Sequence, residues 1–169
     1  MMLAASRIAS PLGMLTLVAE DAGLVAVLWP NEDARRVPLS PTEARAHPVL
    51  EKATRQLGDW FAGRRRDFDL PLAPRGTPFQ LAVWDALAAI PFGNTRSYAA
   101  IAREIGKPDA VRAVGAANGR NPLSIVLPCH RVVGSAGALT GFAGGLAAKR
   151  WLLAHEAADM PLFTSDGAI

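Results

Sequence analysis

Residues that start and end helices between positions 77 and 119 limit the fold of this chain more than any other feature. Thr77-Pro78-Phe79-Gln80 reads as a capping box, with Thr at the N-cap, Pro at the first helical position and Gln bonding back from the third. Apolar residues then recur at helical spacing as far as Ile90, just before Pro91. The pattern predicts a helix that begins at Pro78.

Two shorter helices are predicted next. Ser97 is a suitable N-cap for a helix over Tyr98–Ile105, which Gly106 ends, and Asp109 is predicted to cap a third helix that runs to about Asn118. Two short helices joined by so tight a turn form a helix-turn-helix pattern, which is typical of DNA-binding proteins. The third helix is rich in Ala and Gly, which fits both close helix packing and close approach to another molecule.

The N-terminal part has the pattern of a sheet with one helix. The runs Leu15–Ala19 and Leu24–Trp29 are short, apolar and bounded by turn clusters, which predicts an antiparallel meander within the first thirty residues. Residues 31–48 are polar and interrupted by prolines, as in a loop. The segment His47–Phe61 then has one apolar face at helical spacing.

The connection between the two parts is predicted from its composition. Phe68, Leu70 and Leu72 alternate with polar or proline positions, like one more strand. The following Ala73-Pro74-Arg75-Gly76 is the best candidate for a linker.

These elements predict an α+β fold with two domains. Residues 1–76 would form a small antiparallel sheet with a helix, and residues 77–160 a mainly helical domain with the helix-turn-helix. A chain of 169 residues, half of them hydrophobic, is long enough to build such a core.

Charge is distributed unevenly along the chain. Residues 1–76 carry nearly equal numbers of basic and acidic side chains, whereas Ala110–Trp151 contains five basic residues and no acidic one. A local positive field beside a neutral domain indicates a polyanionic partner, with nucleic acid first in line, although a solvated face has the same signature.

Cysteine usage and the N-terminus indicate a cytoplasmic protein. One cysteine cannot form an internal disulfide, and together with three scattered histidines it is a poor set of metal ligands. The N-terminus lacks the features of a secretory signal, and no apolar run reaches the length of a membrane helix. No metal, no cofactor and no membrane contact are expected.

The single thiol stands beside an imidazole in Pro128-Cys129-His130-Arg131-Val132. A thiolate is a strong nucleophile and a neighbouring base can produce it, so the pair is a candidate for covalent chemistry. Adjacent residues of a strand point to opposite faces, however, and a turn at Pro128 is needed to bring the two side chains together. A buried, inert cysteine beside a surface histidine is the alternative.

This motif resembles the active-site signature of the O6-alkylguanine-DNA alkyltransferases, also called methylated-DNA–protein-cysteine methyltransferases. The resemblance extends from Thr77 to about Glu156 and rests on further motifs in the family's order. They are Thr77-Pro78-Phe79-Gln80, Arg112-Ala113-Val114-Gly115, Asn118-Gly119-Arg120-Asn121-Pro122, Leu139-Thr140-Gly141-Phe142-Ala143-Gly144-Gly145 and Lys149-Arg150-Trp151-Leu152-Leu153.

The resemblance implies a single-turnover repair reaction on O6-alkylguanine, and on O4-alkylthymine, in double-stranded DNA. Cys129 would accept the alkyl group, His130 would be the general base acting through a water, Glu156 would orient His130, and Asn121 would brace the turn that presents the thiol. The protein would act as a monomer without a cofactor.

The resemblance also implies which residues hold the DNA in its minor groove with the target base flipped out. Tyr98 would bond the flipped guanine, and Arg112 would fill the gap left in the duplex. The remaining substrate- and DNA-binding positions are Ala113, Gly115, Ala116, Arg120, Val132, Phe142 and Ala143.

Three positions depart from the family's pattern. Phe142 replaces a tyrosine, Ala143 a serine found in some members, and Ser124 a proline that packs on bulky alkyl groups in others. The resemblance therefore does not imply reactivity toward benzyl adducts. The alternatives to repair are a damage-sensing relative that only binds alkylated DNA, a helix-turn-helix regulator, and a Cys-His hydrolase.

Overall fold

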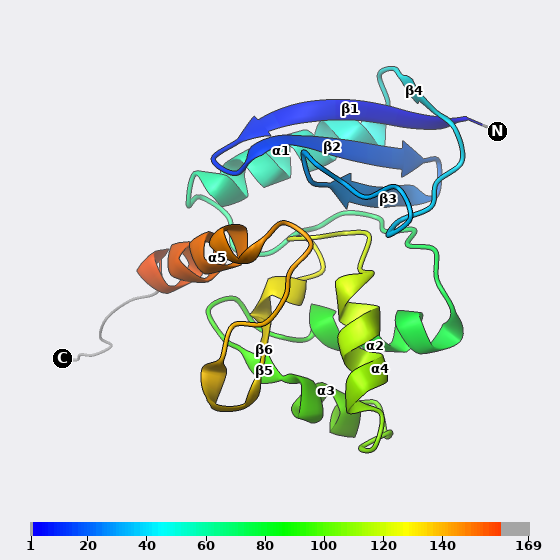
Figure 1. Ribbon diagram of the computed structural model, residues 1–169. Helices are drawn as coiled ribbons and strands as arrows, with labels where there is room; N and C mark the ends of the chain where they lie inside the picture. The colour runs from blue at the N-terminus through cyan, green and yellow to red at the C-terminus, as the bar shows by residue number, and fades with distance from the viewer. Residues whose placement is uncertain (1, 160–169) are drawn as a thin grey trace.

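The computed structural model describes residues 2–159 and has the predicted α+β architecture (Figure 1). A sheet with one helix forms the N-terminal part, and a mainly helical part follows. Residues 1 and 160–169, among them the outer ends of the two predicted domains, lie outside the described residues.

The N-terminal sheet contains the predicted antiparallel meander and one additional edge strand. Its strand order is β3-β2-β1-β4, with β4 parallel to β1. The prediction of a loop throughout 31–48 is wrong at β4, because all three of its residues are exposed and leave no apolar alternation to detect. The strands are β1 (Leu3–Ser10), β2 (Gly13–Glu20), β3 (Gly23–Leu28) and β4 (Thr42–Ala44).

Helix α1 (Pro48–Phe61) covers one face of this sheet (Figure 1). The His47 side chain caps its N-terminus by accepting a hydrogen bond from the Val49 backbone N–H. The predicted apolar face is buried against the strands, and Trp60 near the C-terminal end is fully buried. This end of α1 points toward the helical part of the molecule.

The connecting segment is not the strand predicted from Phe68, Leu70 and Leu72. Its backbone pairs with the sheet at Leu24, which donates from its backbone N–H to the Pro71 carbonyl and accepts from the Ala73 N–H. Pro71 has no N–H to offer, so a longer ladder cannot form.

The helical part contains the capping features predicted for it. The Thr77–Gln80 capping box is present at the start of the first helix, and the Ser97 side chain caps the next. The segments are α2 (Pro78–Ala88), β5 (Arg96–Ser97), α3 (Tyr98–Glu104), α4 (Val111–Gly119), the 3-10 helices η1 (Cys129–Arg131) and η2 (Ser135–Gly137), β6 (Val132–Val133) and α5 (Leu146–Asp159).

Helices α3 and α4 pack together as a helix-turn-helix, with Gly106 ending α3 at a positive φ of 75°. The prediction that Asp109 caps the next helix is wrong. A turn closed by the Ala110 N–H and the Lys107 carbonyl places Ala110 at the N-cap, so Asp109 lies one residue too early, and no side chain caps α4.

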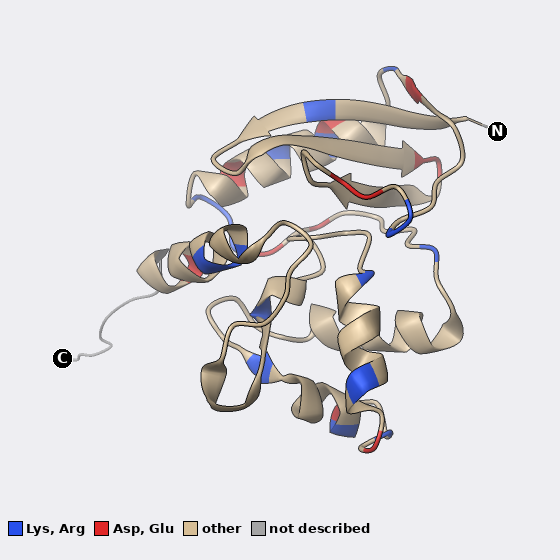
Figure 2. Cartoon of the chain, viewed as in Figure 1, with Lys and Arg blue, Asp and Glu red and all other residues tan. Residues whose placement is uncertain are grey.

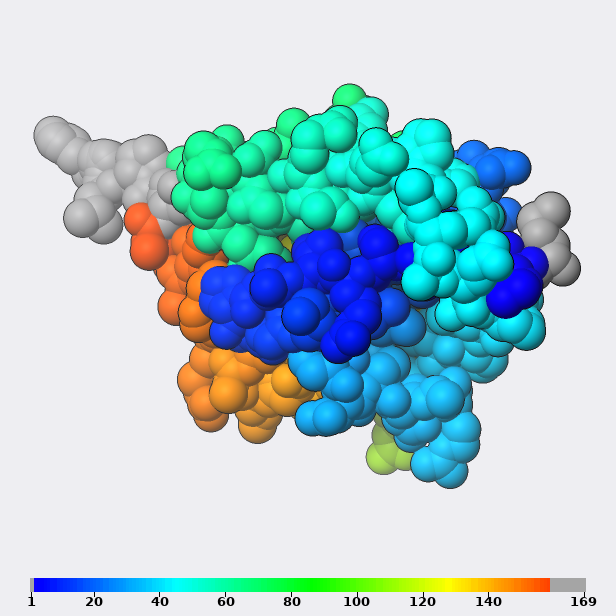
Figure 3. Space-filling model, turned by 90° about the horizontal axis from the view of Figure 1, so that it is seen from above, coloured from blue at the N-terminus to red at the C-terminus, as the bar shows by residue number. Residues whose placement is uncertain are grey.

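The two parts share one hydrophobic core. Leu57 and Trp60 of α1 belong to the same buried cluster as Leu87 of α2 and Leu152 of α5. A view onto the strands shows the segment before α5, in orange, lying against blue residues of the N-terminal part (Figure 3). Side chains from both parts can therefore reach one site.

Candidate active site

A tight turn presents Cys129. The Leu127 N–H bonds to the Leu123 carbonyl at 2.8 Å, and Ile125 between them has a positive φ of 76°. Residues 123–127 therefore form a turn. Asn121 spans the turn, because its Oδ1 accepts from the Leu123 N–H at 3.0 Å and its Nδ2 donates to the Leu127 carbonyl at 2.8 Å.

The 3-10 helix that begins after Pro128 holds both the Cys129 thiol and the His130 imidazole. Pro128 is followed by the single turn of η1, so Cys129 and His130 do not alternate as they would in a strand. The Cys129 side chain is 4% exposed and His130 is fully buried.

His130 is paired with Glu156 from α5. The His130 Nε2 lies 2.9 Å from Glu156 Oε2, and both side chains are buried. Glu156 lies four residues after Leu152, so the two share the inward face of α5. The His130 Nδ1 is buried and has no hydrogen-bond partner among the described residues, which leaves one ring nitrogen available for another group.

Arg131 is a third member of this cluster, and the sequence did not single it out. Its Nη2 and Nε donate to Glu156 at 2.6 and 2.9 Å, and its Nη1 donates to the Ile90 carbonyl at 2.6 Å. The carboxylate thus holds a bidentate guanidinium and an imidazole at once. Its place directly after His130 is the one feature of the sequence that points to this role.

The protonation states of the pair follow from these contacts. Burial alone would raise the pKa of Glu156, but hydrogen bonds from His130 and Arg131 lower it to about 2. An ionised carboxylate only accepts, so the His130 Nε2 carries the proton. Burial lowers the pKa of His130 despite the opposing effect of Glu156, which keeps the ring neutral and its Nδ1 basic.

The Cys129 thiol needs a base. Burial raises its pKa, and hydrogen bonds from Asn121 and Ser124 together with the charges of Arg36 and Lys149 only partly oppose that rise. The thiol is therefore protonated at neutral pH, and its nucleophilic form has to be produced during the reaction.

The predicted positive field is smaller than the charge count indicates. Of the five basic residues between 110 and 151, Arg131 and Lys149 are buried, and Lys149 donates to the Val132 carbonyl at 2.7 Å. These two charges act inside the site. The exposed ones are Arg112, Arg120 and Arg150, and α4 shows basic but no acidic colour in Figure 2.

The residues expected to bind DNA gather around α4 and the start of α3. Arg112, Ala113 and Ala116 are exposed on α4, and Arg120 follows at its C-terminal end. A Cβ built on Gly115 would lie 3.9 Å from the Tyr98 ring. The bare surface of α4 therefore adjoins the Tyr98 side chain.

The other predicted substrate contacts lie around the loop that precedes α5. Tyr98 bonds through its hydroxyl to Thr140 Oγ1 at 2.5 Å. Phe142 is half-buried and Ala143 exposed, whereas Val132, directly after η1, is fully buried. Tyr98 and Phe142 therefore both lie at this loop, and the Lys149 amino group links the Val132 carbonyl to the Thr140 carbonyl of the loop.

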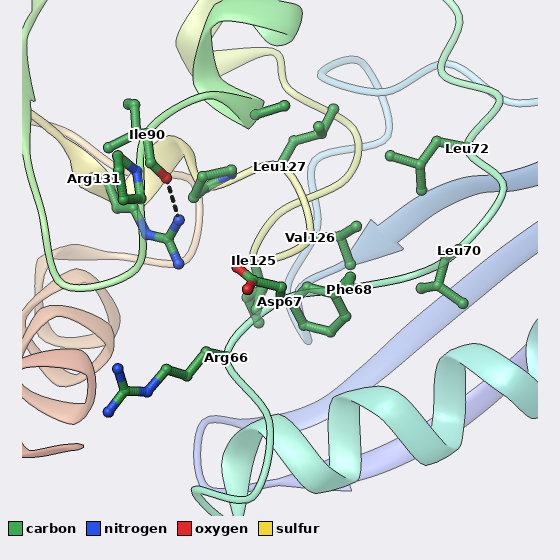
Figure 4. A pocket seen from close by; sticks show the side chains of 13 residues that line it. Arg66, Asp67, Phe68, Leu70, Leu72, Ile90, Ile125, Val126, Leu127 and Arg131 are labelled. Atoms are coloured by element: carbon green, nitrogen blue, oxygen red, sulfur yellow. Dashed lines mark hydrogen bonds between the residues drawn. The ribbon is translucent and has the colours of Figure 1, made fainter. Parts of the chain in front are cut away.

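A separate pocket of 260 Å³ lies beside the turn (Figure 4). The connecting segment contributes Phe68 and Leu70, the turn contributes Ile125 to Pro128, and Arg131 reaches across to the Ile90 carbonyl. Cys129 does not line this pocket, so it is not the place where the thiol meets a substrate.

Within residues 2–159, no group of three or more His, Cys, Asp or Glu side chains is placed to hold a metal ion. No helix in this range has the length and apolar character needed to cross a membrane.

Known proteins resemble both parts of the chain. Residues 78–158 match the family described as 6-O-methylguanine DNA methyltransferase, DNA binding domain, and residues 4–74 match the ribonuclease-like domain of the same family. The methylated-DNA–protein-cysteine methyltransferase of Methanosarcina acetivorans is 45% identical, and the match covers 87% of this chain and 94% of that protein. The methylated-DNA–protein-cysteine methyltransferase of Salmonella typhimurium is 46% identical, and the match covers 89% of this chain and 93% of that protein.

A solved structure has the same fold. The crystal structure of Mycobacterium tuberculosis OGT in complex with DNA aligns with a TM-score of 0.84 at 43% identity, covering 94% of this chain and 96% of that one.

Proposed function

The chain belongs to the 6-O-methylguanine DNA methyltransferase family, and we propose that Cys129 is the residue onto which it takes the alkyl group. Its activity is DNA repair, in which an alkyl group passes from alkylated DNA to a cysteine of the protein itself. The observation that supports Cys129 is that the sequence has a single cysteine, next to a buried histidine paired with Glu156 at 2.9 Å.

The geometry supports a direct displacement. The neutral His130 takes the thiol proton at Nδ1, through one water molecule, while Glu156 stabilises the imidazolium that forms. The Cys129 thiolate attacks the alkyl carbon, the carbon–oxygen bond breaks, and its electron pair stays on O6 of the guanine. O4-alkylthymine has the same kind of bond and is a second substrate of this chemistry.

The departing base needs a proton, and Tyr98 gives it. Its hydroxyl already bonds to Thr140 in the loop before α5 and lies beside α4. The phenol donates to the flipped base as the bond to the alkyl carbon breaks, and then regains a proton from solvent. Phe142 and the backbone of Val132 and Ala143 enclose the base.

DNA binds through the helix-turn-helix with its minor groove against α4. The small side chains of Ala113, Gly115 and Ala116 allow a close approach, and Arg120 contacts the backbone. Because the target carbon lies on a base inside the stack, the nucleotide has to flip out, at a cost of a few kcal/mol. Arg112 offsets part of this cost by occupying the vacated space.

The first experiment measures stoichiometry. Incubation with an excess of duplex containing O6-methylguanine is expected to add one methyl group, about 14 Da, per protein molecule and then to stop, because a thioether offers no route to hydrolysis. Intact-mass and peptide mass spectrometry locate the group. Repeated turnover would instead favour a Cys-His hydrolase, and tight binding without any mass change would favour a damage sensor or a regulator.

Arg112 gives a second prediction. Arg112→Ala is expected to slow methyl transfer from duplex DNA by at least tenfold and to leave the reaction with free O6-methylguanine base nearly unchanged, because the free base needs no flipping. Arg103→Ala, which removes a charge from the exposed side of α3, is the control. A weaker affinity with a shallower salt dependence, at an unchanged transfer rate, would reduce Arg112 to a phosphate contact.

The remaining features of the proposal follow from the site. Asn121, Cys129, His130 and Glu156 are brought together within one chain, so the proposed active unit is a monomer. A reduced thiol is required for every molecule that reacts, which supports the reducing cytoplasm as the place of action. The chemistry and the DNA contacts belong to the domain at 77–160, and the domain at 1–76 supports it.

A further inference from the structure

Trp29, from the end of the N-terminal sheet, makes a buried hydrogen bond to the turn that presents the thiol. Its indole Nε1–H donates to Ser124 Oγ at 3.1 Å. Trp29 is 5% exposed and Ser124 is fully buried. The two residues are 95 positions apart in sequence, so the contact joins the N-terminal part of the molecule to the turn that precedes Cys129.

The backbone holds Trp29 in place for this contact. The Val27 N–H donates to the Pro122 carbonyl at 2.8 Å, and Val27 forms a bridge with Leu123. Strand β3 therefore pairs with the start of the turn, and Trp29, two residues further along, lies on the same side as Val27 and reaches Ser124.

The hydrogen bond from Trp29 limits the further hydrogen bonds that the Ser124 hydroxyl can form. A hydroxyl has one hydrogen to donate, and the indole N–H occupies an acceptor position on Oγ. The one Ser124 hydrogen is then left for another acceptor, and the Cys129 thiol is presented by the same turn. A hydrogen bond from Ser124 is one of the influences that lower the pKa of the Cys129 thiol against the effect of burial.

The Trp29 ring also contacts the loop before α5. Phe142 meets it edge-on, with ring centroids 5.5 Å apart, and a Cβ built on Gly144 would lie 2.8 Å from the ring. Trp29 is therefore fixed between the turn that carries the thiol and the loop that carries Phe142.

We propose that Trp29 is a positioning residue for alkyl transfer, because its indole N–H orients the Ser124 hydroxyl to donate to the Cys129 sulfur and stabilise the thiolate. The inference rests on the proposed role of Cys129. It also assigns a task to the N-terminal part of the chain.

The experiment compares four variants. Trp29→Phe keeps the ring and removes the N–H, Ser124→Ala removes the hydroxyl, and the double variant removes both. Trp84→Phe is the matched control, because it deletes another buried indole hydrogen bond, 2.9 Å long, to the Ala117 carbonyl. Thermal unfolding shows whether each variant is folded.

Two rates are measured against pH. The first is alkylation of Cys129 by iodoacetamide, which reports the thiolate without DNA, and the second is single-turnover methyl transfer from duplex. Trp29→Phe and Ser124→Ala are each expected to shift both profiles to higher pH and to slow both reactions about fivefold at neutral pH, the effect of one neutral hydrogen bond. The double variant is expected to be no slower than Ser124→Ala, and Trp84→Phe to match the parent profile.

Parent-like profiles for Trp29→Phe, or additive effects in the double variant, would overturn the inference. Failure of the proposed function looks different: the parent protein would then carry the methyl group on another residue or on none. The iodoacetamide profiles would still test the link from Trp29 to Cys129 in that case.

Discussion

Cys129→Ser is expected to abolish methyl transfer and to leave the affinity for alkylated duplex within about twofold of the parent value, since the side chain is 4% exposed and forms none of the outer surface of α4. A serine hydroxyl beside the same neutral imidazole stays protonated, because its pKa lies far above that of a thiol. The thiolate is the nucleophile in this chemistry, so no slow residual reaction is expected.

The measurement needs both readouts on one preparation. Mass spectrometry after prolonged incubation tests transfer, and fluorescence anisotropy with O6-methylguanine duplex and with unmodified duplex tests binding. A methyl group found on any residue of Cys129→Ser would remove Cys129 from the mechanism. Loss of binding together with loss of transfer would show that the substitution had disturbed the fold around η1.

Local signals in the sequence were sufficient for much of the architecture. The Thr77–Gln80 capping box and the Ser97 cap depend on residues three positions apart, and both are present. The inward direction of Glu156 follows from its spacing to Leu152. In each case a helix repeats its geometry every few residues, so the pattern is contained in a short window.

Contacts between distant single residues could not be predicted in this way. Arg131 looks like one more surface charge until α5 brings Glu156 to it, and Lys149 looks like another until its amino group is found on the Val132 carbonyl. Trp29 and Ser124 are separated by 95 positions and belong to no periodic pattern. Such pairs depend on how the two parts of the molecule pack together. Local sequence preferences carry no information about that packing.

Glu156→Gln is expected to slow single-turnover methyl transfer about a hundredfold at neutral pH, the usual size of a general-base contribution, with little change in DNA affinity. The amide cannot stabilise the His130 imidazolium, and the charge of Arg131 then acts against it without compensation. His130 becomes a weaker acceptor for the thiol proton, so the apparent pKa of Cys129 rises.

The pH profile has a defined direction. In the parent, the rate rises with pH as Cys129 loses its proton and then levels off. In Glu156→Gln the midpoint of the profile moves to higher pH. The difference in transfer rate between parent and variant is therefore largest near neutral pH. It becomes smaller in alkaline solution, where hydroxide removes the Cys129 proton. Superimposable profiles would remove Glu156 from the mechanism and leave His130 acting alone.

Stability has to be separated from catalysis, because the carboxylate also balances a buried guanidinium. Removing one partner of a buried ion pair costs about 3–5 kcal/mol of unfolding free energy. The folded-state pKa of Glu156, about 2, lies below its ordinary value of 4.5, so its stabilising effect is present above pH 4.5 and is lost as the pH falls toward 2. The parent is expected to lose stability across that range, and Glu156→Gln to lack this step.

A second substitution makes the distinction testable at neutral pH. Arg131→Met/Glu156→Gln removes both charges, so unfolding free energy is expected to recover most of what Glu156→Gln lost, because no unpaired guanidinium stays buried. Methyl transfer is not expected to recover, since His130 still faces an amide where the carboxylate stood. If the rate returned together with the stability, Glu156 would hold the fold around η1 and have no part in moving the thiol proton.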